Sequence, residues 1–213
     1  MQQLLTGRTR LPGFSGEWDV QTLGEIGQFS KGRGLSKDAL SSTGWLPAIP
    51  YTAIYTDFGE VIAASHIRNY AKLPENTHTI SMPHLLIASA SNMLENIGQA
   101  TAFTGGFPVA VGGDVLLYRT SADVSFLSRL LSLRSHRSRI VALSQGSTIR
   151  HVYASTFIDY EVRLPPLREQ QAIAGVLSDM DAEIAVLEQR RDKTTLIKQG
   201  MMQELLTGRI RLI

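Results

Sequence analysis

Apolar residues in the C-terminal part of the chain recur at steps of four and three residues, the spacing of a coiled-coil seam on one face of a helix. Polar residues interrupt the spacing after position 187, and it resumes at position 201. The seam consists of Ile173, Leu177, Met180, Ile184, Leu187, Met201 and Leu205. This pattern predicts a helix that packs lengthwise against a second helix.

Prolines and a glycine mark the limits of this helix. Pro165 and Pro166 suit its approach and first turn, where a missing backbone N–H costs nothing, and Gly208 suits its end. About 41 residues at 1.5 Å each make a helix of roughly 60 Å, longer than one small domain covers. Part of the apolar stripe should therefore meet a partner helix; packing along the chain's own domain is the alternative.

Short apolar runs between glycines and polar residues characterise the preceding part of the chain. Residues 85–91, 107–111 and 114–119 are expected to be strands. The last two are separated by Gly112 and Gly113, a pair that suits the tight turn of a hairpin. Residues 125–143 are expected to form one helix, with its arginines mostly on the polar side and an apolar side made of Phe126, Leu127, Leu130, Leu131 and Leu133. The fold class predicted is a mixed α/β (α+β) globular domain followed by one long helix.

The two ends of the chain repeat one another. Residues 1–11 and 202–212 agree at nine of eleven positions. Since the second copy ends the predicted long helix, the first should be the tail of an equivalent preceding helix, as in duplicated modules. We therefore expect three parts: the tail of a preceding helix region (1–11), a globular domain (12–165) and a long dimerisation helix (166–213).

Composition narrows the class of protein. The 213 residues include no cysteine, which excludes disulfides, thiolate metal sites and a cysteine nucleophile and fits a reducing cytoplasm. No apolar run is long enough for a transmembrane helix, and the N-terminus has no secretion signal pattern. A cytoplasmic protein without a membrane partner is the expectation.

Positive charge is concentrated in one segment. The whole chain has a net charge of only +2, whereas residues 119–152 carry six arginines against one acidic residue, Asp123. Such clustering favours phosphate binding, although a solvated basic face explains the charge equally well. The arginines are Arg119, Arg129, Arg134, Arg137, Arg139 and Arg150.

A small-residue turn at 146–151 brings together two hydroxyls, an arginine and a histidine. Its backbone N–H groups with Ser147 and Thr148 suit phosphate oxygens, and an arginine such as Arg150 can bind guanine. The structural alternative is that the hydroxyls cap the turn and Arg150 pairs with a carboxylate. KGRG at 31–34 adds two basic residues between glycines. The predicted DNA contacts are Lys31, Arg33, Arg134, Arg137, Ser147, Thr148, Arg150 and His151.

Enzymatic chemistry has little support in the sequence. The histidines show no metal-ligand spacing, no phosphate-binding P-loop or nucleophile elbow occurs, and no catalytic residue, metal or cofactor is predicted.

The stretch 146–184 resembles the junction between a target-recognition domain and a conserved helix in specificity subunits of type I restriction–modification systems. The shared parts are the Gly146-Ser147-Thr148 turn, Leu164-Pro165-Pro166-Leu167 and the pair Glu169-Gln170. Residues 11–34 are similar to the start of a recognition domain, and MQELLTGRIRL is similar to the end of the conserved region.

This resemblance implies a non-catalytic subunit that reads double-stranded DNA and docks methyltransferase subunits, with a restriction subunit as a further partner. Family members carry two recognition domains and two antiparallel helices, whereas this sequence has one of each, so the resemblance implies a homodimer as the substitute. The runner-up function is a coiled-coil scaffold whose globular domain binds protein, and a nuclease with an unrecognised site is a third option.

Overall fold

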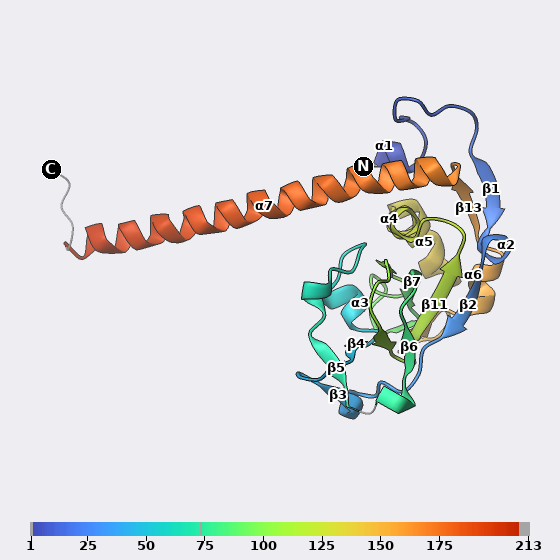
Figure 1. The fold of residues 1–213 in the computed structure, drawn as a ribbon, viewed down its shortest axis with the longest axis horizontal. Coiled ribbons are helices and arrows are strands. Elements are labelled where there is room, and N and C mark those ends of the chain that lie inside the picture. Colours follow the sequence, from blue (N-terminus) through green and yellow to red (C-terminus); the bar gives the residue numbers. More distant parts are fainter. Residues whose placement is uncertain (1, 73, 209–213) are drawn as a thin grey trace. The chain divides into compact units, whose positions relative to one another are not determined.

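The structure is a computed structural model that describes residues 2–72 and 74–208. It contains two compact units, Met1–Ala174 and Gly175–Ile213. The first unit mixes short helices and strands, and one long helix starts in it and makes up the described part of the second (Figure 1). The predicted mixed α/β domain followed by a long helix is therefore confirmed.

Seven α-helices are present in the described residues: α1 (Gln2–Leu5), α2 (Leu23–Ile26), α3 (Ala53–Thr56), α4 (Val124–Leu131), α5 (Arg134–Leu143), α6 (Ala154–Ile158) and α7 (Leu167–Leu206). The strands are β1 (Asp19–Thr22), β2 (Gly27–Lys31), β3 (Leu40–Ser41), β4 (Pro47–Ile49), β5 (Asn69–Ala71), β6 (His78–Ile80), β7 (His84–Ala88), β8 (Ala90–Ser91), β9 (Ala100–Phe103), β10 (Val109–Val111), β11 (Val115–Thr120), β12 (Arg150–His151) and β13 (Glu161–Leu164).

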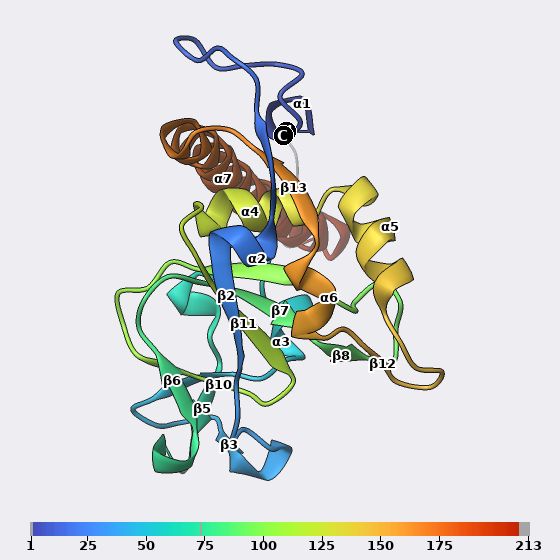
Figure 2. The same ribbon diagram turned by 90° about the vertical axis from the view of Figure 1, so that its right-hand side faces the viewer.

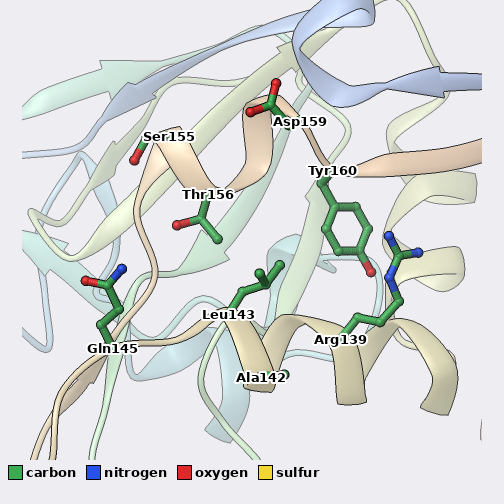
Figure 3. Close-up of a pocket in the computed structure, with 8 residues that line it drawn as sticks. All are labelled: Arg139, Ala142, Leu143, Gln145, Ser155, Thr156, Asp159 and Tyr160. Atoms are coloured by element: carbon green, nitrogen blue, oxygen red, sulfur yellow. The ribbon is translucent and has the colours of Figure 1, made fainter.

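Two larger sheets organise the first unit. One has the strand order β2-β11-β7-β9 and is antiparallel throughout. The other has the order β3-β5-β4-β10-β6, with a parallel pairing between β4 and β10. Two strand pairs, β1-β13 and β8-β12, complete the described strands (Figure 2). Helices α5 and α6 both contribute to the pocket in Figure 3.

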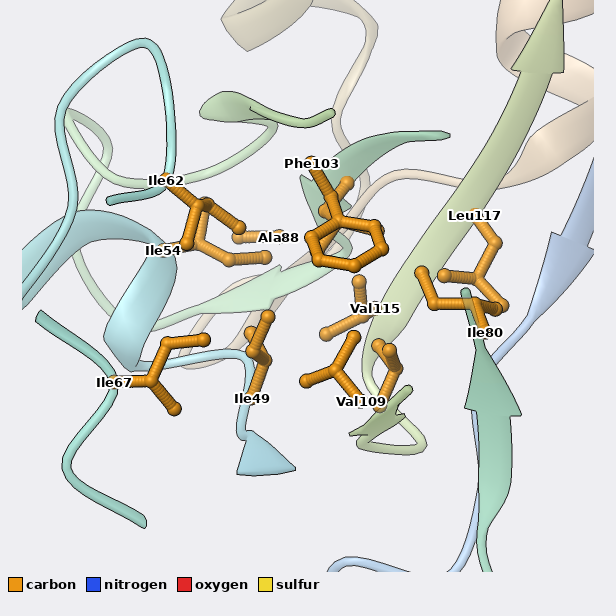
Figure 4. Packing of buried hydrophobic residues seen from close by; sticks show 12 residues of the cluster. Ile49, Ile54, Ile62, Ile67, Ile80, Ala88, Phe103, Val109, Val115 and Leu117 are labelled. Carbon is orange, nitrogen blue, oxygen red and sulfur yellow. The ribbon is translucent and has the colours of Figure 1, made fainter. Parts of the chain in front are cut away.

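The main core contains side chains from strands of both larger sheets. β7 and β11 are apolar at consecutive positions because both faces of their sheet are covered. One face contributes Leu86, Ala88, Val115 and Leu117 to the core, where they meet residues of β4, β6 and β10 (Figure 4). On β11, Tyr118 is also buried, stacks on Phe29 and donates a hydrogen bond of 2.6 Å to the carbonyl of Leu23.

The expected hairpin at Gly112-Gly113 is wrong. β10 pairs with β4 and β6, whereas β11 pairs with β2 and β7, so the two strands lie in different sheets. Neither glycine adopts the positive φ that tight hairpin turns require. The position that must stay small is Gly32, where a Cβ would overlap the carbonyl oxygen of Gly112 as two chain segments cross.

The single helix expected over 125–143 is also wrong, because the segment forms α4 and α5 with a break between them. The Ser132 hydroxyl donates to the carbonyl of Ser128, a local bond that competes with helix continuation. Leu133 then adopts an extended backbone conformation. The predicted apolar residues of α4 are buried, but so is Arg129, which donates to the carbonyl of Ser125 instead of facing solvent.

Gln170 connects the first turn of α7 to the rest of the first unit by hydrogen bonds. This residue is buried, with 5% of its surface exposed. Its Nε2 donates to the carbonyl of Pro165 at 2.8 Å, and its Oε1 accepts from the backbone N–H of Asp123 at 2.9 Å. Asp123 in turn caps α4 by accepting from the backbone N–H of Phe126. The helix ends as expected before Gly208, and residues 209–213 of the predicted C-terminal part lie outside the described residues.

Candidate nucleic-acid interface

Residues 145–151 form a short hairpin whose tip is the predicted small-residue turn. Gln145 and His151 exchange two backbone hydrogen bonds of 2.8 and 2.7 Å, and β12 continues the pairing onto β8. Gly146 has φ of +110°, and a Cβ there would overlap the carbonyl oxygen of Ile149. Only glycine fits this position without strain, so the turn depends on it.

The two hydroxyls lie at the exposed tip of this hairpin. Ser147 and Thr148 are exposed, and neither side chain makes a hydrogen bond within the described part of the chain. The alternative that these hydroxyls cap the turn is therefore not what the structure shows. Both remain able to donate to an incoming acceptor such as a phosphate oxygen.

Arg150 lies at the base of the hairpin and is bound to Ser144, the residue that directly follows α5. Its Nε donates to Ser144 Oγ and its Nη2 to the Ser144 carbonyl, both at 2.7 Å. The guanidinium thus hydrogen-bonds to Ser144 and not to a carboxylate. Through these bonds it fixes the hairpin to the end of α5. His151 stacks on the half-exposed Tyr153, with 6.2 Å between ring centroids.

A second loop, residues 92–97, follows β8, the strand that pairs with β12 at the base of the hairpin. Arg137 of α5 holds this loop, because its Nη2 donates to the carbonyls of Glu95 at 3.0 Å and Ile97 at 2.7 Å. Burial lowers the pKa of Arg137. Met93 and Leu94 of the loop are about half exposed, so this edge presents apolar as well as polar groups.

The six arginines of the basic segment do not form one face. Arg119, Arg134 and Arg139 are exposed, whereas Arg129 is buried and the other two hold loops. Arg134 begins α5, and the Arg139 guanidinium lies 4.4 Å from the centre of the Tyr160 ring. Of the arginines predicted to contact DNA in this segment, Arg134 is exposed, whereas Arg137 and Arg150 are partly buried.

Lys31 and Arg33 are exposed at the end of β2, and Lys31 Nζ lies 3.7 Å from Asp114 Oδ1. Gly32 between them approaches the chain's own backbone at Gly112, not an external phosphate. Ser89 connects this region to the hairpin through its backbone. Its N–H donates to the carbonyl of Asp114, and its carbonyl accepts from the N–H of Val152. Ser89 thus links Asp114, which lies beside Lys31, to Val152, the residue after the hairpin.

A pocket of about 630 Å³ adjoins the hairpin base between α5 and α6. Gln145 lies at the hairpin side of the pocket and Asp159 and Tyr160 at the α6 side (Figure 3). Tyr160 accepts or donates a 2.9 Å hydrogen bond with His136 Nδ1. Burial first, and then the nearby Arg139 charge, lower the pKa of His136. The residues that line the pocket are Arg139, Ala142, Leu143, Gln145, Ser155, Thr156, Asp159 and Tyr160.

The predicted seam on α7 divides into a buried and an exposed part. Ile173 and Leu177 have no exposed surface. The remaining seam residues are between 37% and 61% exposed and form an exposed apolar stripe. They are Met180, Ile184, Leu187, Met201 and Leu205.

Among the residues described, no group of three or more His, Asp or Glu side chains could hold a metal ion. No helix there is long and apolar enough to cross a membrane. Sequence reasoning missed Ser144, the partner of Arg150; its place directly after an apolar helix end was the available signal.

Comparison with known proteins points to one family. Residues 15–195 match the model of the type I restriction modification DNA specificity domain. A stretch of 76 residues is 36% identical to the type I restriction enzyme MjaVIII specificity subunit of Methanocaldococcus jannaschii, which is 36% of this chain and 18% of that protein.

Solved structures share the fold at low sequence identity. The S subunit of a type I system from M. genitalium aligns with a TM-score of 0.56 at 17% identity, covering 91% of this chain and 47% of that one. The HsdS subunit from Thermoanaerobacter tengcongensis aligns at 0.57 and 18%, covering 95% and 49%. A chain from a type I R-M complex aligns at 0.59 and 16%, covering 94% and 50%. The chain thus spans about half the length of these structures.

Proposed function

Because this chain belongs to the type I restriction modification DNA specificity domain family, matched over residues 15–195, we propose that its globular domain reads one half of a DNA site. The exposed hairpin tip carries this proposal. Ser147 and Thr148 lie at the end of a hairpin that Arg150 fixes to α5, so their hydroxyls are available in a defined place. Such groups set the register of a protein on the phosphate backbone.

The remaining predicted contacts have different roles in this proposal. Lys31, Arg33 and Arg134 are exposed and would contact phosphates directly. Arg137 and Arg150 would act by holding the 92–97 loop and the hairpin in place. His151, stacked on Tyr153, would offer a flat surface at the same edge.

The subunit would contribute recognition and no chemistry. Adenine methylation would come from a type I methyltransferase subunit that docks on it, and cleavage from a restriction subunit, all in the cytoplasm with the DNA. This chain spans about half the length of the S-subunit chains named above, and in this proposal the second recognition domain comes from a second copy of the chain.

A homodimer would form through the exposed stripe of α7 in an antiparallel helix pair. Two identical chains related by a twofold axis present the same half-site contact twice, in inverted orientation. The recognised DNA would then be an interrupted palindrome, with a gap set by the length of α7. Methylome sequencing of cells that carry this chain with its methyltransferase checks this: an asymmetric motif contradicts the homodimer.

A gel-shift series tests DNA binding by the purified chain. Affinity for duplex DNA should fall steeply as salt rises, because protein cations displace condensed counterions. The double substitution S147A/T148A should weaken binding without changing the folded state, and S15A, an exposed serine in another loop, is the matched control. If the purified chain gave no gel shift of duplex DNA at low salt, the alternative function, a protein-binding scaffold, would be favoured. The family match does not favour that alternative.

A further inference from the structure

The two repeats have the same local structure at the helix ending, over the residues that the structure describes in both. Thr6 donates from N to the Gln2 carbonyl at 3.1 Å and from Oγ1 at 2.9 Å. Thr207 makes the equivalent bonds to Gln203 at 3.0 and 2.7 Å. The glycine that follows has φ of +70° at position 7 and +71° at position 208. Both copies are therefore the same helix ending.

The N-terminal copy is docked on the first unit. Leu5 is completely buried, and α1 packs on α4. Gly7 lies against the ring of Trp18, where a Cβ would come within 3.2 Å of Cε2. Arg10 binds Glu169 through two hydrogen bonds of 2.6 and 2.7 Å, and it also lies over the Trp18 ring. Glu169, whose side chain has no exposed surface, is thus neutralised by this segment.

The C-terminal copy carries the same docking residues, and its described part, residues 202–208, is largely exposed. Leu206, the equivalent of Leu5, is 83% exposed. Gly208 repeats Gly7, and in the sequence Arg211 follows Leu206 by the same five positions that separate Arg10 from Leu5. Residue 211 lies outside the described residues, so for it the comparison is one of sequence alone.

The two positions at which the copies differ lie away from the docking surface. They are Gln3 and Thr9, replaced by Glu204 and Ile210 in the C-terminal copy. In the N-terminal copy both are exposed, and they contact each other through a 3.0 Å hydrogen bond. Gly7, which lies against Trp18, and Arg10, which binds Glu169, have the same residue types at the equivalent positions 208 and 211.

We propose that the surface holding Gln2–Arg10 is a docking site for the repeat itself, and that it accepts the C-terminal repeat, residues 202–212, of a second copy of this chain. The two copies of the repeat are then competitors for one site built around Trp18 and Glu169. An antiparallel helix pair brings the C-terminal end of each α7 towards the partner's globular domain. This inference extends the homodimer proposed above and adds the surface on which the helix end binds.

Peptide binding to the full chain tests the inference without DNA or dimerisation. A fluorescent peptide of residues 202–213 should bind the L5D variant at least tenfold more tightly than the wild type, because Leu5 no longer occupies the site. R10A, which removes a different contact of the same segment, should have the same effect. The matched control peptide, with L206D and R211A, should bind neither variant, and unlabelled peptide 1–11 should displace the probe.

A second measurement covers the case in which these variants do not fold. A peptide with a photoreactive residue in place of Leu206 should crosslink the wild-type chain in α4 or near Trp18. Equal binding of the probe and the control peptide, or crosslinks confined to other elements, would overturn the inference. The homodimer proposal can fail independently of this inference. Variants of the exposed α7 stripe that abolish the dimer should leave peptide binding unchanged.

Discussion

Arg10 and Glu169 are 159 positions apart in the chain, and their side chains form a two-hydrogen-bond ion pair in which the carboxylate is completely buried. Arg10 also donates to the backbone carbonyls of Ser15 and Gly16. The pair joins the N-terminal segment to the first turn of α7. It therefore gives the Glu-Gln pair of the family motif a structural role, with Glu169 holding one segment and Gln170 another.

Removing one member of this pair should be costly. R10A should lower the unfolding midpoint by several degrees, because the buried Glu169 carboxylate loses its partner. The double variant R10A/E169Q should be more stable than R10A alone, since a neutral amide replaces the unpaired charge. Thermal unfolding of the two variants and the wild type gives the comparison; R8A, at an exposed arginine nearby, is the control.

Arg150 should influence DNA binding through the position of the hairpin. R150A should weaken specific binding about tenfold, roughly 1.4 kcal/mol, because it loses both bonds to Ser144. R150K should rescue little, since an ammonium cannot reproduce the two-point contact of a guanidinium. Titration of a specific duplex measures both variants. Full affinity in R150A with an unchanged sequence preference would show that the hairpin needs no such support.

His136 should make stability depend on pH. Its folded-state pKa is lowered by burial and by Arg139, so the unfolded chain binds a proton more readily. Stability should therefore be fully present above about pH 6.5 and fall as the pH drops from there to the lowered pKa. H136Q should flatten this dependence. Urea unfolding at pH 7.5 and 5.5 checks the difference, and an equal loss in both proteins would contradict it.

Ile184 on the exposed stripe of α7 should be required for the homodimer. It is 50% exposed in the single chain, and I184D would place a charge in the centre of the proposed helix pair. The dimer dissociation constant should rise at least about a hundredfold, roughly 3 kcal/mol. Q189D, two residues past the seam position 187, is the matched control. Sedimentation at micromolar concentration distinguishes the outcomes, and a wild-type monomer would remove the basis for the dimer.

The long helix and the repeated ends could be predicted from the sequence because their determinants are local. α7 begins after Pro165-Pro166 and ends before Gly208, and its apolar spacing repeats along a single element. The Thr207 and Gly208 helix ending likewise involves contacts of four residues or fewer. Apolar runs also identified β7, β10 and β11 as strands, since burial on both faces requires such residues.

The pairing of distant elements was decided only by the tertiary structure. Gly112-Gly113 permits a hairpin, but which strand lies beside β10 depends on residues far away in the chain, and β4 and β6 take that place. The roles of the arginines differ for the same reason. Arg137 binds backbone carbonyls and Arg150 binds Ser144 because the fold brings these groups within reach. A charge pattern records how many cations a segment has, whereas their partners are set by three-dimensional proximity.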